Sequence, residues 1–227
     1  MTIKECVDFI NFWIRKDRGA FLSIEESIEA IDNGQLAYYS DIKPKYATSQ
    51  LIKDTLAPFK KKYPFTPSET VSGYIVVPSN VNYLDLLDVE IQFQISNRTV
   101  YAPVKMINED ERSIRLNSQI DPPTVTSPVG EMDVPRYIKL YPTGSGYTGT
   151  VTYFKRPVKP VYAYTIISGR VIQYDAANST QLEWRDTEHI PILLKALSSI
   201  GINLGDAEVG QFAQLKSQEN YQGVNHL

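Results

Sequence analysis

Apolar residues recur every three or four positions at the start of the chain, which predicts an amphipathic helix. The stripe consists of Ile3, Cys6, Val7, Phe9, Ile10, Trp13 and Ile14. A second helix is expected after Ser23, because Ser23 and Glu26 have the spacing of a capping box. Asn33-Gly34 is expected to interrupt it. A third, shorter helix is expected to start near Thr48 or Ser49 and to end before Pro58.

The pattern changes after Lys62, where prolines become frequent and the apolar period drops to two. Short β-rich runs separated by Asn, Asp, Gly and Pro predict strands of an antiparallel sandwich or barrel. The expected strands are Gly73–Val77, Leu86–Ile95, Val100–Met106, Ser113–Leu116, Arg136–Tyr141, Gly149–Lys155 and Arg170–Tyr174. Residues 117–135 contain four prolines and are expected to form a long surface loop.

Helical spacing returns after Glu183. Gly205-Asp206 separates two predicted helices, the second of which carries Val209, Phe212 and Leu215. The first carries a stripe of Ile190, Leu193, Leu194, Leu197, Ile200 and Leu204.

Neither end of the chain can bury its apolar stripe alone. We therefore expect an α+β fold in which the N- and C-terminal helices form one helical subdomain around an inserted antiparallel β-sandwich or barrel. The expected boundaries are 1–62 for the N-terminal helical part, 63–182 for the β subdomain and 183–227 for the C-terminal helices.

Composition narrows the function classes. The 227 residues carry a formal net charge of −3, whereas strong nucleic-acid binders show a basic excess. The longest apolar runs are too short for a membrane span, and no membrane contact is expected. The single Cys6 allows no intrachain disulfide. Fifteen tyrosines are more than such a chain needs, and aromatic residues of this kind favour interfaces as well as cores.

Residues 144–151, GSGYTGTV, match the glycine-rich loop of protein kinases, and Gly144–Gly149 match a dinucleotide fingerprint. A dinucleotide fingerprint needs a helix after it, but TVTYF predicts a strand. A kinase needs catalytic and metal-binding motifs downstream, and the sequence contains neither. The segment is therefore interpreted as a hairpin whose glycines allow positive φ angles, and no nucleotide cofactor is expected.

The polar cluster in residues 182–191, LEWRDTEHIP, is interpreted as a strand-to-helix junction. Asp186 or Thr187 is the expected N-cap, and Glu188 suits the first helical turn. Neither histidine, His189 or His226, has a second ligand at zinc spacing, and no metal site is expected. No catalytic residue is predicted, which favours a structural or interaction role over an enzyme.

Two segments are candidates for contact with other molecules. Lys60, Lys61 and Lys62 form a basic run that is interpreted as a solvated linker and, alternatively, as a contact to the DNA backbone. The polar C-terminal tail is expected to order only on a partner, with docking through Tyr221, Gln222, Val224 and Leu227.

Three stretches resemble the head-to-tail connector proteins of tailed bacteriophages: IVVPSNVNYLDLLDVEIQF, YIKLYPTGSGYTGTVTYFKRPVKP and LEWRDTEHIPILLKALSSIGINLGDAEVGQFAQL. The second is similar to their strand–proline–hairpin segment, and the third to their ending of an acidic-Trp junction followed by two helices. The resemblance covers roughly residues 70–220 and is greatest to the tail tubular A-type adaptors and to the ring proteins of crAss-like phages.

The resemblance implies a structural virion protein at the head–tail junction, assembled in the cytoplasm of the bacterial host. In this family the subunits form a ring, twelve copies in all, around the channel through which the genome passes. Its implied partners are further copies of itself, the portal protein, further tail ring or nozzle proteins, and DNA that slides past without sequence-specific binding. The alternative is another tail, baseplate or fibre-attachment protein; a nucleotide-binding enzyme that uses Gly144–Gly149 is the remote alternative.

Overall fold

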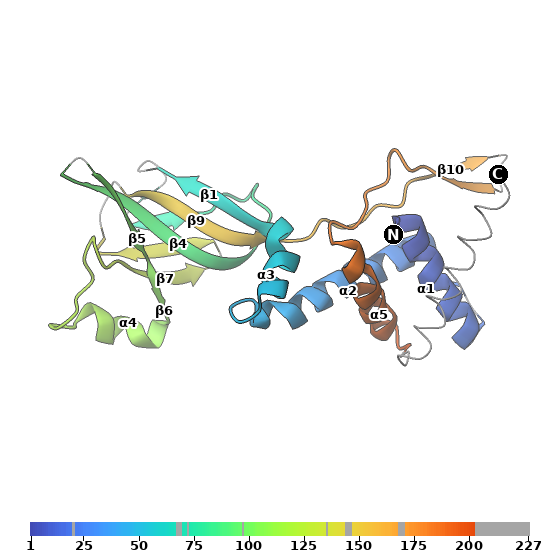
Figure 1. Cartoon of the computed structure of the whole chain (residues 1–227), viewed down its shortest axis with the longest axis horizontal. Helices are drawn as coiled ribbons and strands as arrows, with labels where there is room; N and C mark the ends of the chain where they lie inside the picture. Colours follow the sequence, from blue (N-terminus) through green and yellow to red (C-terminus); the bar gives the residue numbers. More distant parts are fainter. Residues whose placement is uncertain are drawn as a thin grey trace. The chain divides into compact units, whose positions relative to one another are not determined.

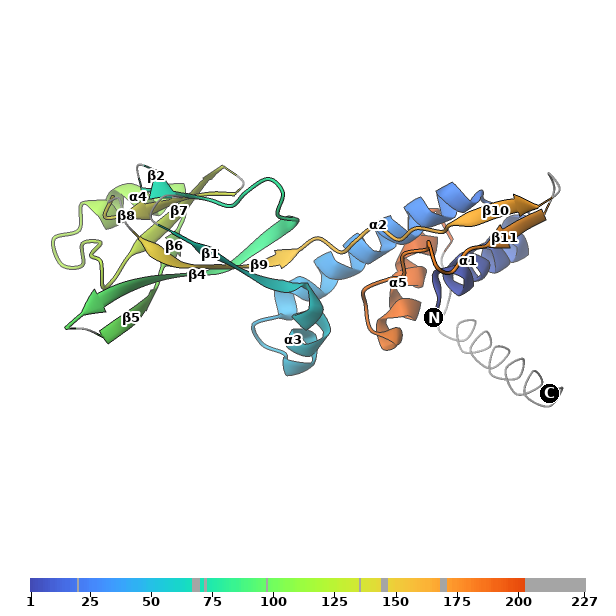
Figure 2. The same cartoon turned by 90° about the horizontal axis from the view of Figure 1, so that it is seen from above.

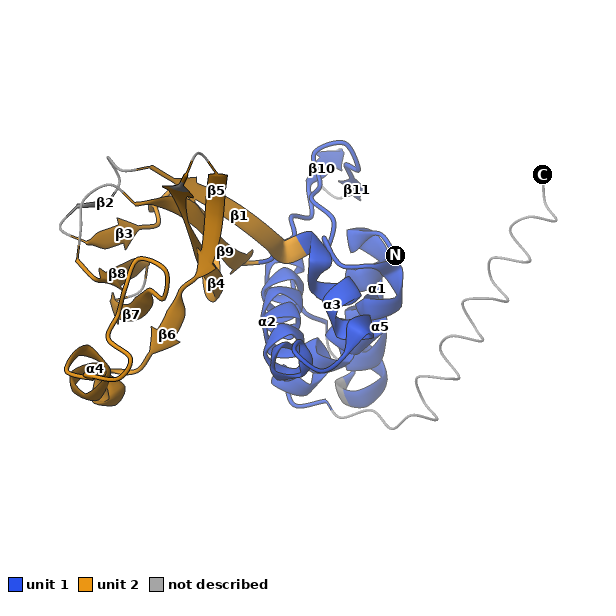
Figure 3. Ribbon diagram, turned by 60° about the vertical axis from the view of Figure 1, so that its left-hand side comes forward, with its two compact units in different colours: residues 1–58, 157–227 blue, residues 59–156 orange. Residues whose placement is uncertain are grey.

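The computed structural model describes residues 1–19, 21–66, 70–71, 73–96, 98–134, 136–143, 147–167 and 171–202. The fold is α+β, as the sequence predicts, with helices and mostly antiparallel sheets. The chain divides into two compact units: unit 1 combines residues 1–58 with the chain after Arg156, and unit 2 comprises residues 59–156 (Figure 3). Unit 1 is thus built from both ends of the sequence.

Helices α1 (Ile3–Arg18), α2 (Ile24–Ile42), α3 (Gln50–Leu56) and α5 (Asp186–Ser199) belong to unit 1 (Figure 1). Short 3-10 turns follow α2 at Lys43–Lys45 and α3 at Ala57–Phe59. All seven residues of the predicted stripe on α1 are buried. Ser23 and Glu26 form the predicted capping box of α2, and Ser49 caps α3. The capping predictions hold because they depend only on neighbouring residues.

Gly34 does not interrupt α2, contrary to the sequence prediction. It allows α2 and α5 to approach closely, since a Cβ added at Gly34 would lie 2.6 Å from the Ile192 carbonyl oxygen and 2.9 Å from Ala196 Cβ. The helix–helix contact compensates for the low helix propensity of glycine.

Unit 2 contains two sheets that enclose an apolar core. One sheet has the order β1 (Lys60–Phe65), β9 (Thr148–Lys155), β4 (Tyr83–Ile95), β5 (Arg98–Pro103). The other has the order β2 (Thr70–Val71), β3 (Tyr74–Val76), β8 (Tyr137–Tyr141), β7 (Val129–Val134), β6 (Lys105–Ile107). Both sheets contribute to the buried cluster of Phe65, Ile75, Val77, Val89, Ile91, Ala102, Val104, Ile138, Leu140 and Val151.

The GSGYTGTV segment is not the predicted hairpin. It joins β8 to β9, and these strands belong to different sheets. Gly149 has a steric role within β9 rather than a positive φ: a Cβ there would lie 2.1 Å from the Glu90 carbonyl oxygen and 2.6 Å from Phe65 Cζ. Residues 144–146 lie outside the described part of the chain.

Two further strand predictions and one loop prediction are corrected. Residues 113–116, predicted as a strand, end helix α4 (Glu109–Leu116), whose first turn contains Glu109, Asp110 and Glu111. Acidic side chains favour a helix N-terminus through its dipole. Residues 117–135 are not all loop, because Val129–Val134 form β7, and β7 pairs with β6 in parallel. The predicted strand Val100–Met106 is divided into β5 and β6 in different sheets.

The boundaries of the β subdomain also differ from the prediction. Residues 157–182, assigned from the sequence to the β part, belong to unit 1. They contain the hairpin of β10 (Tyr164–Ile167) and β11 (Val171–Tyr174). Helix α5 begins one or two residues earlier than expected: Arg185 is its N-cap, and Asp186, one of the two expected N-caps, lies in the first turn.

Replacing Gly149 with alanine is expected to destabilise unit 2 by about 3 kcal/mol or more, since a backbone carbonyl cannot move away as a side chain would. Urea unfolding measures this change. Thr148→Ala, at an exposed position in the same strand, is the control and should change stability by less than about 0.5 kcal/mol. Equal stability of the two variants would contradict the steric role of Gly149.

Candidate functional site

Strands β10 and β11 form a two-stranded hairpin in unit 1 (Figure 2). This hairpin carries the largest group of exposed apolar side chains in the described part of unit 1. Its strands pair antiparallel, with Ile166 opposite Ile172 and Ile167 opposite Val171. Because successive residues of a strand face opposite sides, these two pairs lie on opposite faces of the ribbon. Their exposed fractions are 61% for Ile166, 54% for Ile172, 47% for Ile167 and 59% for Val171.

Tyrosines and local hydrogen bonds hold the base of this hairpin. The ring of Tyr162 lies 4.9 Å from that of Tyr174 and 6.3 Å from that of Tyr164, centroid to centroid. The Tyr164 hydroxyl donates to Glu25 Oε1 on α2 at 3.3 Å, and Gln181 Nε2 donates to the Tyr174 hydroxyl at 3.1 Å. The base is thereby fixed to the helical unit, whereas the distal apolar pairs remain exposed.

Exposure on both faces distinguishes this hairpin from an ordinary surface strand. An isolated two-stranded hairpin is marginally stable in water, and contiguous exposed apolar patches mark interaction sites. Sequence reasoning predicted β11 but missed β10. The signal was present, because YTII and VIQY are β-branched runs separated by the three residues SGR.

A buried polar network lies in the core of unit 1. The amide of Gln35 is fully buried; its Nε2 donates to Asp32 Oδ1 at 2.7 Å and to the Val158 carbonyl at 3.2 Å. Its Oε1 accepts from Trp184 Nε1 at 3.2 Å. In addition, the Val158 amide donates to Glu183 Oε2 at 3.0 Å. The network joins α2 to two separate segments, 157–160 and 182–185.

The polar cluster of residues 182–191 belongs to this junction. The Tyr38 hydroxyl donates a hydrogen bond to Glu188. The pKa of Tyr38 is raised, mainly because the hydroxyl is buried and secondly because of this hydrogen bond. Arg185 donates to Thr55 and to Glu188. The side chains therefore connect α2, α3 and α5, in agreement with the predicted structural role of the segment.

His189 is the buried histidine of this junction, with 3% of its surface exposed. Its Nε2 donates to the Trp184 carbonyl at 3.1 Å, which places the proton on Nε2. Burial lowers the pKa of His189, and the amino terminus of Met1 lowers it further, against smaller opposing effects of the Trp184 carbonyl, Asp186 and Glu188. The imidazole is therefore neutral at pH 7.

The predicted linker of Lys60, Lys61 and Lys62 forms the first half of β1. Lys60 pairs with Phe154, Lys61 with Tyr153 and Lys62 with Thr152, and all three lysines are exposed on an edge strand. Lysine on an edge strand opposes pairing with foreign strands. Protection of the sheet edge is therefore sufficient to explain the three lysines. The alternative, that they contact the DNA backbone, stays a prediction. The predicted docking residues Tyr221, Gln222, Val224 and Leu227 lie outside the described residues.

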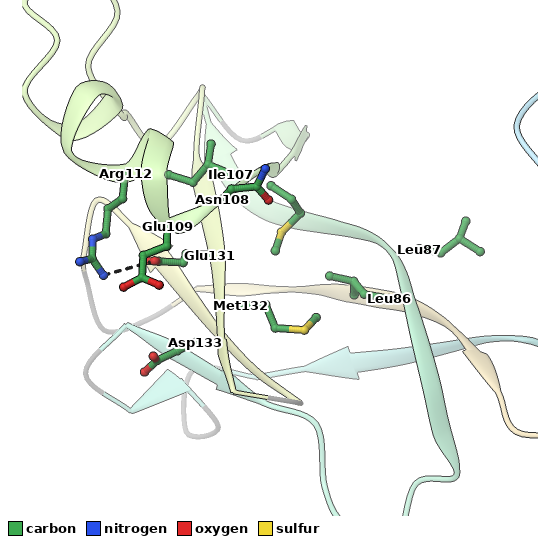
Figure 4. A pocket seen from close by; sticks show the side chains of 10 residues that line it. Leu86, Leu87, Ile107, Asn108, Glu109, Arg112, Glu131, Met132 and Asp133 are labelled. Carbon is green, nitrogen blue, oxygen red and sulfur yellow. Dashed lines mark hydrogen bonds and ion pairs between the residues drawn. The ribbon is translucent and has the colours of Figure 1, made fainter. Parts of the chain in front are cut away.

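Unit 2 has a hollow of about 470 Å³ beside α4 (Figure 4). Glu131, 6% exposed, accepts hydrogen bonds there from Arg112 Nη1 at 3.2 Å and from the Tyr141 hydroxyl at 3.3 Å. These bonds tie α4 to β7 and β8, so the charged groups of the hollow have a structural explanation. The lining residues are Leu86, Leu87, Met106, Ile107, Asn108, Glu109, Arg112, Glu131, Met132 and Asp133.

The described residues meet neither the requirements of a metal site nor those of a membrane-spanning helix. Among them, no three His, Cys, Asp or Glu side chains are grouped so that they could hold a metal ion. No helix within the described ranges is long and apolar enough to cross a membrane.

Comparison with known proteins yields no match: no protein-family model fits the chain, and no curated protein is significantly similar to it.

Lowering the pH is expected to destabilise unit 1 through His189. The unfolded state binds a proton near pH 6.5, whereas the folded state resists protonation because its pKa is lowered. The contribution is therefore complete above about pH 6.5 and decreases below it, by at most about 1.4 kcal/mol per pH unit, until the folded pKa is passed. Urea unfolding between about pH 5 and 7.5 measures this slope.

His189→Gln should flatten that slope, because the variant has no imidazole to protonate at this position. The carboxyl pKa values of Glu26, Asp121, Asp175 and Asp186 are lowered, so their contributions are lost only below their ordinary values of 4.5 for Glu26 and 3.8 for the aspartates, outside this window. An unchanged slope in His189→Gln would refute the assignment.

Proposed function

We propose that this chain is a structural subunit of an oligomeric ring at the portal–tail junction of a tailed phage. The observation that carries the proposal of self-assembly is the hairpin β10–β11, with four large aliphatic side chains exposed on its two faces. Covering such side chains on assembly is favourable by about 1.5–3 kcal/mol for each one fully buried. The location in a virion rests on the sequence resemblance to head-to-tail connectors.

The organisation of the chain supports this role. Both ends of the sequence contribute helices to unit 1, and an independent β-sandwich is inserted between them. A subunit of this kind can use one unit for contacts within the ring and the other for contacts with a neighbouring tail component. The structural explanations for Glu131 and the 182–191 cluster agree with a protein whose polar side chains serve architecture.

The proposed ring surrounds the channel through which the genome passes. Each phosphate that a channel neutralises adds affinity and slows sliding, so a mild negative charge suits free passage. The formal net charge of −3 agrees with this. The proposed partners are the portal protein above the ring and the tail ring or nozzle proteins below it.

Replacing Ile166 and Ile172 together with aspartate is expected to weaken self-association about 100-fold, because about 3 kcal/mol of apolar burial is lost and two charges would need desolvation. The variant should stay folded, since both residues are exposed. Sedimentation of the purified chain, alone and with the portal protein, measures association, and negative-stain images reveal rings.

Tyr101→Asp is the matched control, because Tyr101 is 55% exposed on β5 of unit 2 and lies outside the hairpin. It should assemble like the wild-type chain if the hairpin is responsible. Rings formed equally well by the double-aspartate variant would refute the role of the hairpin. Absence of rings from the wild-type chain, alone and with a portal, would refute the proposed function.

A further inference from the structure

The hollow beside α4 in unit 2 combines apolar side chains with carboxylates (Figure 4). Leu86, Met106 and Met132 supply the apolar part, and Glu109 and Asp133 are exposed acidic residues of the lining. A lysine or arginine side chain matches such a surface, because its aliphatic part packs on apolar groups while its charged end reaches a carboxylate.

The negative charge of the hollow is not neutralised from within. Arg112 forms an ion pair with Glu131 at 3.2 Å. Asp133 accepts a 3.4 Å hydrogen bond from the hydroxyl of Tyr74, and the Glu109 carboxylate forms no hydrogen bond or ion pair with any described residue. Three carboxylates and one guanidinium line the hollow, so its formal charge is negative.

The lysines of β1 carry the opposite charge on the other side of unit 2 (Figures 1 and 3). Lys60, Lys61 and Lys62, the lysine run, are exposed, and none of their ammonium groups has a partner among the described residues. Lysines that keep foreign strands away from the backbone of an edge leave their ammonium groups available for side-chain contacts. Unit 2 therefore has a basic edge and an acidic hollow.

The lysine run and the hollow cannot meet within one copy. Strands β9 and β4 lie between β1 and the hollow, and Leu86 on β4 belongs to its near wall. With strands about 4.8 Å apart, the backbones of Lys61 and Leu86 are about 10 Å apart, and the carboxylates belong to the far wall of α4 and β7. The free edge of β1 faces away from β9, so the lysines face another copy.

The two surfaces lie at the same level of the sandwich. Lys61 pairs with Tyr153, and Tyr153 pairs with Leu86, so the three residues form one row across the sheet. Subunits of a closed ring are related by rotation alone, so surfaces that meet between neighbours must lie at one level along the ring axis. This row meets the condition when the strands run along that axis.

We propose that the lysine run of one copy docks into the acidic hollow beside α4 of the next copy, an inference that rests on the proposed ring function. The contact joins two different surfaces of identical chains, so it repeats head to tail and closes when the rotation per subunit divides the circle. Opposite charges guide the orientation of the two sandwiches. The β-sandwich thereby adds a second contact between neighbours to that of the hairpin.

Cysteine crosslinking tests this contact in assembled samples. One batch carries Lys61→Cys and another Glu109→Cys, both at exposed positions. The native Cys6 is fully buried and does not compete. A mixture of the two batches should give an oxidised dimer, whereas each batch alone should not. A mixture of Lys61→Cys with Ile114→Cys is the matched control and should give none, because Ile114 is 76% exposed on the same helix but does not line the hollow.

The outcomes separate this inference from the proposed function. Crosslinking of Lys61→Cys to itself would mean that two β1 edges meet, which overturns the inference and leaves self-assembly intact. Equal crosslinking to Ile114→Cys, or rings seen in the microscope without the mixed crosslink, would also overturn the inference alone. No rings under any condition would overturn the proposed function, on which the inference rests.

Charge reversal gives an independent readout by sedimentation. Lys61→Glu should weaken assembly about tenfold, and combining it with Glu109→Lys should restore at least part of that loss. Asp110→Lys is the matched control for the second change, because Asp110 lies in the same helical turn but does not line the hollow. Losses that add in the Lys61→Glu, Glu109→Lys variant, or equal rescue by Asp110→Lys, would contradict the contact.

Discussion

The buried amide of Gln35 is the constraint on which unit 1 depends. Its oxygen accepts a hydrogen bond from Trp184, and its nitrogen donates to Asp32 and Val158. One side chain on α2 therefore holds both the 157–160 segment and the 182–185 segment. A buried polar group left without a partner costs about 1–3 kcal/mol, so the network specifies one arrangement of these segments. The close packing of α2 against α5 at Gly34 adds an apolar contact between the N-terminal and C-terminal parts of unit 1.

Local signals predicted the helical unit well. The stripe on α1, the capping box of Ser23 and Glu26, and the start of a helix near Thr48 or Ser49 depend on nearby residues, and all three predictions are confirmed. Gly34 was misread because its role depends on Ile192, which is far away in the sequence. A pattern read along one helix cannot reveal the helix that packs against it.

The β unit was predicted in kind but not in detail. Alternation identified β3, β4, β8 and β9 of unit 2; in β8, for example, Ile138 and Leu140 are buried whereas Tyr137 is exposed. It failed at residues 113–116, where alternation in SIRL hid the end of an acid-initiated helix. Sheet membership was also invisible: β8 and β9 flank a hairpin-like glycine motif but pair with other partners.

The candidate site was largely missed from the sequence. Exposure of Ile166 and Ile172 is a tertiary property, and a run of isoleucines indicates a strand without indicating that it lacks a cover. The sequence instead directed attention to Lys60–Lys62, which an edge strand explains, and to the C-terminal tail, which lies outside the described residues.

A density map of the assembled particle is the most direct measurement of the central claim. Our account predicts a closed ring of this chain below the portal, in which each β10–β11 hairpin is covered by the adjacent copy. Density for the chain at the distal end of the tail, or a ring in which the hairpins face solvent, would contradict it.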